Sequence, residues 1–310
     1  MGLLADARTV GLMRAVRDCP LGREELISRL DFGGSAFDRR VNRLTQMGVF
    51  IARQAAHDHR HREYLLTHCG RNLLEIGEEL ALAAASLDTQ SGRLGAALVK
   101  VVADPSDRAI MRVLLEALRP FSELLRLAHG SWRTDGARRS TRLTPAGLSL
   151  RLERLEQLGL ARRWPAPRRG AALYGPGDDL WRLGRVVLRS ALWRWRWTPA
   201  CVPRMAGDLP GLARMLAPRV RAAGGEEIRV VLHVDAPPGR DGWPDVVVSL
   251  IDGRMTVPEL TLSDPHARAS ATPPAWCEAL LSGEFDAVAI DGDAASARTV
   301  LTGLASVLHA

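Results

Sequence analysis

Four polar side chains within a five-residue stretch have the chemistry needed to read DNA bases: Arg39, Arg40, Asn42 and Arg43. Arginine can donate two parallel hydrogen bonds to the edge of guanine, and asparagine pairs in a similar way with adenine. The apolar residues around them recur at intervals of three and four: Phe37, Val41, Leu44 and Met47. This spacing predicts an amphipathic helix whose apolar stripe faces a core, with the polar side chains off that stripe. Such a helix could lie in a major groove.

A second stretch repeats this pattern about 110 residues later, at both the apolar and the polar positions. Its apolar residues are Leu148, Leu152, Leu155 and Leu158, and its arginines are Arg151 and Arg154. A glycine, Gly48 in the first copy and Gly159 in the second, ends each helix before a β-prone run. Two copies of one unit predict two similar domains in tandem.

Each copy also has two short amphipathic segments before this helix, which meet at Pro20 or Pro120, and a strand hairpin after it. The order helix, helix, helix, hairpin is the winged helix-turn-helix arrangement. Arginines in the hairpins and in an insertion of the second copy are expected to contact the DNA backbone or the minor groove. They are Arg60, Arg62, Arg138, Arg139, Arg142, Arg168 and Arg169.

The second copy is the weaker candidate for base recognition. Arg39 corresponds to Leu150 there, and Asn42 corresponds to Glu153. A carboxylate can accept a hydrogen bond from cytosine or pair with a neighbouring arginine, but it also repels phosphate. The first helix is therefore predicted to read bases, and whether the second one does so is left open.

The motif Asn42-Arg43-Leu44, followed by Gly48 and then by Tyr64-Leu65-Leu66-Thr67, resembles the HxlR group of winged-helix transcriptional regulators. The resemblance covers residues 5 to 90, and the second copy departs from it at Tyr174-Gly175-Pro176. It implies a regulator that binds double-stranded DNA. Because members of this group are typically dimers, a chain with two copies is expected to be a pseudo-twofold monomer or a weak homodimer.

Charge is unevenly distributed along the 310 residues. Residues 1–200 contain 33 basic and 21 acidic side chains, whereas residues 201–310 contain 9 basic and 14 acidic ones. A positive field over the two copies suits a polyanion, because arginines that neutralise phosphates release condensed counterions. An arginine-rich composition without any nucleic-acid partner would give the same excess, and this alternative stays open.

The last third of the chain reads as a curved antiparallel meander of strands at 228–234, 245–251, 254–260 and 267–271, after a helix over 209–223. A helix capped by Thr272, a strand over 287–290 and a helix over 294–308 follow. The segments 249–253, 280–284 and 290–293 resemble the sterol-carrier-protein fold, which implies an apolar tunnel for a hydrophobic small molecule. We expect its cavity to be bordered by Trp243, Leu250, Met255, Trp276 and Leu280. A domain that only packs is the alternative.

Two clusters have more than one interpretation. Histidines around the first hairpin, His57, His59, His61 and His68, could share a metal, but a solvated turn is the simpler explanation. Tryptophans between residues 181 and 197 could pack between domains or line an aromatic cavity. We expect no metal and no cofactor.

The sequence thus predicts an α+β protein with three domains: winged helix-turn-helix domains over 1–100 and 101–203, and a sterol-carrier-protein-like α/β sandwich over 204–310. No nucleophile elbow or phosphate-cradling loop is recognisable, so an enzyme is not expected. Widely separated cysteines and the lack of a leader or long apolar run predict a cytoplasmic protein away from membranes. The predicted function is DNA-binding transcriptional regulation governed by a hydrophobic ligand. The alternative is non-catalytic sequestration of a hydrophobic or aromatic metabolite, as in antibiotic self-resistance.

Overall fold

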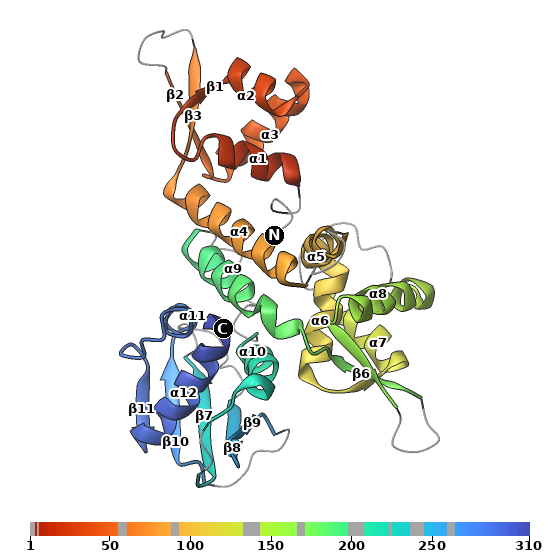
Figure 1. Ribbon diagram of the computed structural model, residues 1–310, viewed down its shortest axis with the longest axis vertical. Coiled ribbons are helices and arrows are strands. Elements are labelled where there is room, and N and C mark those ends of the chain that lie inside the picture. The colour runs from red at the N-terminus through yellow and green to blue at the C-terminus, as the bar shows by residue number, and fades with distance from the viewer. Residues whose placement is uncertain are drawn as a thin grey trace. The chain divides into compact units, whose positions relative to one another are not determined.

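The computed structural model describes residues 4, 6–54, 61–87, 93–132, 143–165, 171–197, 208–222, 225–235, 245–258 and 264–310. The chain mixes helices and strands and divides into two compact units, Met1–Ala103 and Asp104–Ala310 (Figure 1). The second unit joins residues that the sequence assigns to a second and a third domain. Among the described helices, none has both the length and the apolar character needed to cross a bilayer.

The first unit places three helices beside a small sheet and ends in two further helices, of which α4 is the longest. The helices are α1 (Ala7–Ala15), α2 (Arg23–Leu30), α3 (Gly34–Gln46), α4 (His68–Leu87) and α5 (Arg93–Ala103). The strands are β1 (Leu21–Gly22), β2 (Phe50–Gln54) and β3 (Arg62–Leu66), in the order β1-β3-β2. Both pairings of β3 are antiparallel.

The second unit begins with the same succession of elements. Its helices are α6 (Pro105–Glu116), α7 (Phe121–Trp132) and α8 (Pro145–Gln157), and its strands are β4 (Arg119–Pro120), β5 (Ala161–Trp164) and β6 (Leu173–Pro176). The sheet order β4-β6-β5 repeats that of the first unit. The repeat seen in the sequence is therefore a repeat of helix order, strand order and strand direction.

The two third helices, α3 and α8, end in the same way. Gly48 and Gly159 have φ values of 68° and 67°, a left-handed conformation that glycine adopts without a side-chain clash. The amide groups of Val49 and Leu160, one residue further on, donate to the carbonyl oxygens of Leu44 and Leu155 at 2.9 Å. These bonds satisfy carbonyl groups that would otherwise be left unpaired at the helix end. Phe37, Val41 and Leu44 are buried as their spacing predicted, whereas Met47, the fourth residue of the predicted stripe, is 39% exposed at the end of the helix.

The last part of the second unit is a five-stranded sheet with helices against it. The strands are β7 (Ile228–Val234), β8 (Val246–Ile251), β9 (Arg254–Thr256), β10 (Ala267–Ala271) and β11 (Ala289–Gly292). Their order is β11-β10-β7-β8-β9, and β10 runs parallel to β7. The predicted antiparallel meander is wrong at this point, because β10 lies inside the sheet beside β7 instead of next to β9. Its buried residues are alanines, Ala267, Ala269 and Ala271, which leave room for a helix above them.

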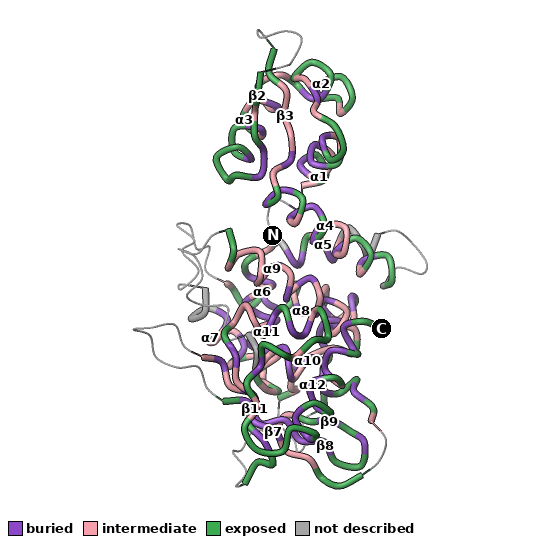
Figure 2. The backbone as a smooth tube through the Cα atoms, turned by 90° about the vertical axis from the view of Figure 1, so that its left-hand side faces the viewer, coloured by how far each residue is buried: buried purple, intermediate pink, exposed green. Residues whose placement is uncertain are grey.

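Helices connect this sheet with the second repeat. They are η1 (Leu180–Leu183), α9 (Gly184–Trp197), α10 (Asp208–Leu216), η4 (Ala217–Arg219), α11 (Pro273–Ser282) and α12 (Ala294–His309). Helix α12 packs on β7 and β10, α10 contacts both α6 and β8, and α11 contacts α9. Strand β8 is buried from Val246 to Leu250 (Figure 2). The second repeat and the sheet therefore share contacts within one unit.

Several element ends differ from the sequence-based predictions. The helix predicted over 209–223 ends at Leu216, because Pro218 removes a backbone donor and the chain continues as a 3₁₀ turn. Thr272 precedes α11 without a capping hydrogen bond from its side chain, whereas Asp293 caps α12 by accepting from the Ala295 amide at 3.0 Å. Strand β11 begins at Ala289, two residues later than predicted.

Candidate nucleic-acid interface

Helices α2 and α3 are joined by a short turn over residues 31–33. Asp31 adopts a left-handed conformation, with φ 49°, and Phe32 is buried behind it. The Phe32 ring meets the Phe37 ring edge-on at a centroid distance of 6.1 Å, and Phe37 meets Tyr64 at 5.9 Å. This aromatic cluster fixes the inner face of α3 against the turn and the sheet.

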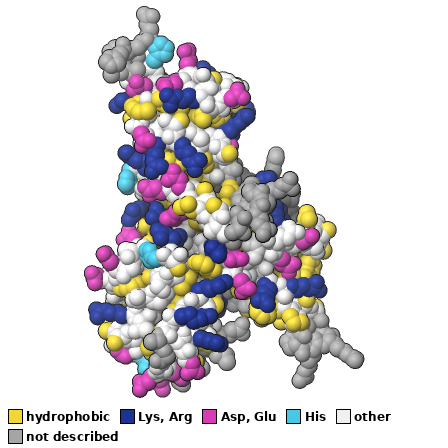
Figure 3. Space-filling model, in the orientation of Figure 1, with side chains coloured by type: hydrophobic (Ala, Val, Ile, Leu, Met, Phe, Trp, Pro, Cys, Tyr) yellow, Lys and Arg dark blue, Asp and Glu magenta, His cyan; other side chains and the backbone are white. Residues whose placement is uncertain are grey.

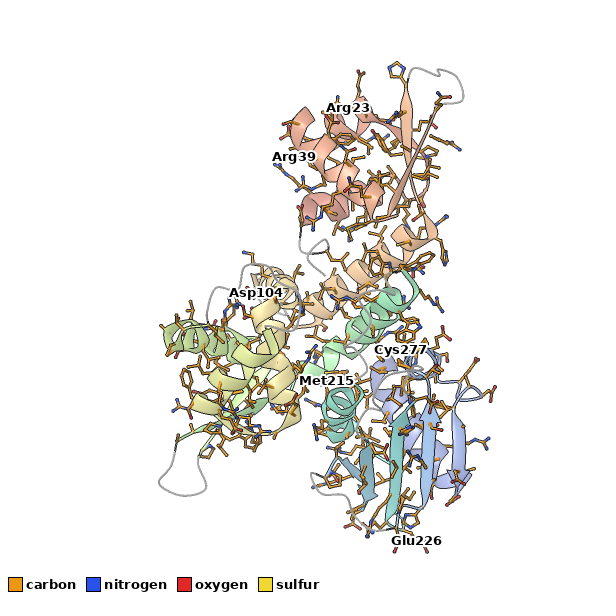
Figure 4. All side chains as sticks on the ribbon, turned by 180° about the vertical axis from the view of Figure 1, so that it is seen from behind. Arg23, Arg39, Asp104, Met215, Glu226 and Cys277 are labelled. Carbon is orange, nitrogen blue, oxygen red and sulfur yellow. The ribbon has the colours of Figure 1, made fainter. Side chains whose placement is uncertain are left out.

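The outer face of α3 presents polar side chains. Those exposed along this face are Ser35, Arg39, Asn42, Arg43 and Gln46. The Arg39 Nε atom donates weakly to the Ser35 carbonyl oxygen at 3.4 Å, and the side chain points away from the domain (Figure 4). Asn42 and Arg43 have no hydrogen-bond or ion-pair partner among the described residues. The predicted exposure of Arg39, Asn42 and Arg43 is confirmed, and their contact with bases stays a prediction.

Arg40 points inward, which differs from its predicted place among the base-reading residues. Its guanidinium donates to Asp6 Oδ2 and, at 3.1 Å, to Thr9 Oγ1, and it lies 5.3 Å from the centre of the Phe32 ring. Asp6 also caps α1 by accepting from the Arg8 amide at 3.1 Å. Arg40 therefore connects the third helix to the capped start of the first.

The second copy repeats this connection and extends it. Asp104 caps α6 by accepting from the Ser106 amide at 2.8 Å, as Asp6 caps α1 (Figure 4). Arg151, the counterpart of Arg40, contacts Asp104 at 3.0 Å and Asp107 at 2.6 Å. Arg154, the counterpart of Arg43, pairs with the other oxygen of Asp107. The two arginines of α8 that were predicted to contact DNA thus form ion pairs within their own unit.

The exposed face of α8 lacks the chemistry found on α3. Leu150 is 70% exposed where α3 has Arg39, and Glu153 is exposed where α3 has Asn42. With Arg154 held by Asp107, no unpaired cation lies on the described outer face of this helix. The sequence left open whether the second copy reads bases, and the arrangement of these side chains gives it no evident means of doing so.

The two helix-capping carboxylates have lowered pKa values. Burial is the largest single influence and would raise the pKa of Asp6 and Asp104, but the hydrogen bonds and charges around each carboxylate, those of Arg40 or Arg151 foremost, together lower it. Burial raises the pKa of Asp107, whose side chain is fully buried, although two arginines oppose this change. The carboxylate charge at Asp6 thus stabilises the fold, whereas the charge at Asp107 is desolvated and needs both arginines.

Acid should remove the contribution of the Asp6–Arg40 pair. The folded-state pKa of Asp6 lies below its ordinary value of 3.8, so the stabilisation is complete above pH 3.8 and is lost as pH falls through the lower, folded-state pKa. In Asp6→Asn, the side-chain oxygen can still cap α1 but the charge is absent. We expect the variant to melt below the wild type at pH 7 and the difference to shrink below pH 3.8. A difference in melting temperature that is constant from pH 7 to pH 3 would contradict this.

Of the other arginines predicted to contact DNA, the structure describes only Arg62. Arg62 is exposed at the start of β3, close to the Arg53–Glu63 pair on the same hairpin. The remaining predicted contacts lie outside the described residues: Arg60, Arg138, Arg139, Arg142, Arg168 and Arg169. The visible face in Figure 3 shows basic side chains on the first unit interspersed with acidic ones. Charge on this unit is therefore mixed, and an interface has to be identified from individual side chains.

Two arginines near α3 were not predicted from the sequence. Arg23 forms a bidentate pair with Asp38 at 3.0 and 2.9 Å, which links α2 to the second turn of α3 (Figure 4). Arg8 is exposed in the first turn of α1, with its guanidinium 5.6 Å from the centre of the Phe32 ring. A cation in the first turn opposes the helix dipole, and this was the available sequence signal that Arg8 has another role. Its position beside the turn suits a backbone phosphate.

The residues predicted to border a ligand cavity lie at two separate places. Leu250 pairs with Met255 and with Ile228 at the start of β7. Trp276 donates its indole N–H to the His233 carbonyl oxygen at 2.8 Å, near the other end of β7, and Leu280 follows one turn later on α11. Five residues of strand separate these places by about 17 Å. All four side chains are at most 4% exposed and belong to the core; Trp243 lies outside the described residues.

The histidine and tryptophan clusters add no further site. His57 and His59 lie outside the described residues, and the described part of the chain contains no group of three His, Cys, Asp or Glu side chains placed to bind a metal. Trp181 lies between the guanidinium groups of Arg182 and Arg219, at 5.0 and 5.7 Å. These cation–π contacts are internal to the second unit and support packing.

Neither a protein-family model nor a curated protein gives a significant match to this chain.

Proposed function

We propose that the chain is a DNA-binding transcriptional regulator that contacts DNA through the winged helix-turn-helix of its first copy. The observation that carries this proposal is the outer face of α3, where Arg39, Asn42 and Arg43 are exposed on a helix that is fixed from behind. Exposed arginine and asparagine side chains on a rigid helix fit guanine and adenine edges in a major groove. Arg8 and Arg62 would contact phosphates on either side.

The second copy has a different role in this proposal. Its α8 offers Leu150 and Glu153 where α3 offers Arg39 and Asn42. One chain would therefore read a single site with α3, instead of two half-sites with two recognition helices. In place of a pseudo-twofold contact through α3 and α8, one monomer would contact DNA asymmetrically, through α3 alone.

For the sheet of the second unit we propose a packing role. Its candidate ligand-binding side chains are core residues at two places along β7, and the indole N–H of Trp276 is already satisfied by a backbone carbonyl. This favours regulation by DNA binding over sequestration of a hydrophobic metabolite. The described part of the sheet supplies structure for the second copy through α10 and α12.

The test is selection of the intact protein against a pool of random DNA duplexes, followed by a salt titration on the enriched sequence. The two exposed arginines assigned to phosphates, Arg8 and Arg62, predict a slope of log affinity against log salt of about −2 if each neutralises one phosphate. The enriched duplexes should share one short motif without twofold symmetry. A pool that stays random after repeated selection, or a palindromic motif read by two equal halves, would contradict the proposal.

A further inference from the structure

The two copies differ at one buried position behind the third helix. Thr9 and Asp107 are equivalent, since each lies three residues after the aspartate that caps the first helix of its copy, Asp6 or Asp104. Thr9 is 1% exposed and Asp107 is fully buried. Both side chains face the third helix and accept a hydrogen bond from its first inward-pointing arginine, Arg40 or Arg151.

The residue at this position determines whether a second arginine of the third helix is exposed or held in an ion pair. The Thr9 hydroxyl carries no charge, and it is occupied by Asp6 and Arg40. Arg43 then remains exposed without a partner among the described residues. The Asp107 carboxylate has a second oxygen, and Arg154, the counterpart of Arg43, pairs with it.

We infer that the residue three positions after the capping aspartate determines whether the outer arginine of the third helix, Arg43 or Arg154, is available to bind DNA. Threonine leaves the outer arginine available, and aspartate turns it inward. This inference rests on the proposed function for its consequence, since the available arginine is taken to contact DNA. Thr9 is therefore a positioning residue, which acts through Arg43 without touching the DNA itself.

The test introduces the second-copy residue into the first copy. Thr9→Asp creates the set found in the second copy, two aspartates and two arginines, so the fold can accommodate it. The matched control is Thr9→Asn, which has nearly the same shape without the charge. Both variants are made in the full chain, and their folding is compared with the wild type by circular dichroism and thermal melting.

Two measurements separate the inference from the proposed function. Reaction with phenylglyoxal, followed by peptide mass spectrometry, reports the accessibility of Arg43, with Arg39 on the same helix as the internal reference. We expect Arg43 to react several-fold more slowly in Thr9→Asp and at the wild-type rate in Thr9→Asn. Affinity for the enriched duplex should fall about tenfold or more in Thr9→Asp only, as expected for loss of one bidentate contact.

Each outcome is decisive for one of the two claims. If Arg43 in folded Thr9→Asp reacts as fast as in the wild type, the inference is overturned. Protection of Arg43 in a protein that binds no DNA in any form supports the internal ion pair and overturns the proposed function. Should Thr9→Asp fail to fold, the wild type alone provides the test, because Arg43 should react several-fold faster than Arg154. Equal rates for these two arginines would overturn the inference.

Discussion

Replacing Arg39 and Arg43 together by alanine should abolish sequence-specific DNA binding while leaving the fold intact. Each bidentate contact between arginine and guanine contributes about 1 to 3 kcal/mol of discrimination, so losing both should cost about 2 to 6 kcal/mol. Both side chains are exposed, and neither forms an ion pair among the described residues. We therefore expect an unchanged melting temperature. The measurement is affinity for the enriched duplex and for a scrambled duplex, at one salt concentration.

The control lies on the exposed face of α8, at the counterparts of Arg39 and Asn42. Leu150→Ala combined with Glu153→Ala changes the exposed face of α8 to the same extent, and we expect little effect on affinity. If this pair of substitutions weakens specific binding as much as the arginine pair does, then α8 reads DNA and the asymmetric interface is wrong.

Replacing Asp107 by alanine should destabilise the second unit by about 3 kcal/mol. Removing one partner of a buried ion pair typically costs about 3 to 5 kcal/mol, because the remaining charge is left uncompensated. The lower end applies here, since the Arg151 and Arg154 side chains are 25% and 36% exposed and can turn toward water. Arg151 also keeps its contact with Asp104. Denaturant unfolding of the full chain, followed by circular dichroism, measures the change in either unit.

A surface ion pair in the first unit provides the comparison. Asp38→Ala removes the bidentate partner of Arg23, but both side chains are nearly half exposed, at 45% and 48%. Exposed pairs contribute less than about 1 kcal/mol. Equal losses of stability in Asp107→Ala and Asp38→Ala would show that burial of the Asp107 network adds nothing to the second unit.

The repeated unit could be predicted from the sequence because the residues that specify it lie close together along the chain. The spacing of Phe37, Val41 and Leu44 determines which side of α3 is buried, and a glycine in a left-handed conformation, Gly48, determines where the helix ends. Both features depend on residues within a few positions of each other, so the pattern survives in the second copy. The hairpin pairing after each helix is equally local, with Phe50 opposite Leu66 in the first copy.

The inward direction of Arg40 could not be predicted from periodicity. A position off the apolar stripe excludes the core, but it does not distinguish a side chain that meets solvent from one that meets a distant carboxylate. Asp6 lies far away in the sequence and becomes a neighbour only when α1 packs near α3. Comparison of the two copies gives only part of the signal: Arg40 is retained as Arg151 together with a capping aspartate, but the exposed Arg43 is also retained, as Arg154.

The position of β10 was missed for a related reason. Alternation of apolar and polar residues identifies the buried face of a strand, but it does not specify which strand pairs with it or in which direction. The observed sheet order, with β10 between β11 and β7, makes it a central strand, and α12 packs over its buried alanines. The predicted meander followed chain order, and the actual sheet does not.

The central place of β7 has a consequence for synthesis and for damaged chains. One edge of β7 pairs with β8, the next strand in the chain. Its other edge pairs with β10, which is synthesised only after β9. Until β10 has left the ribosome, the backbone N–H and C=O groups on that edge of β7 have no partner in the sheet. Unpaired strand edges are templates for association with other chains. Fragments that end between β9 and β10 should therefore aggregate. A protease cut at this point, followed by loss of β10, would expose the same edge of β7 to other chains.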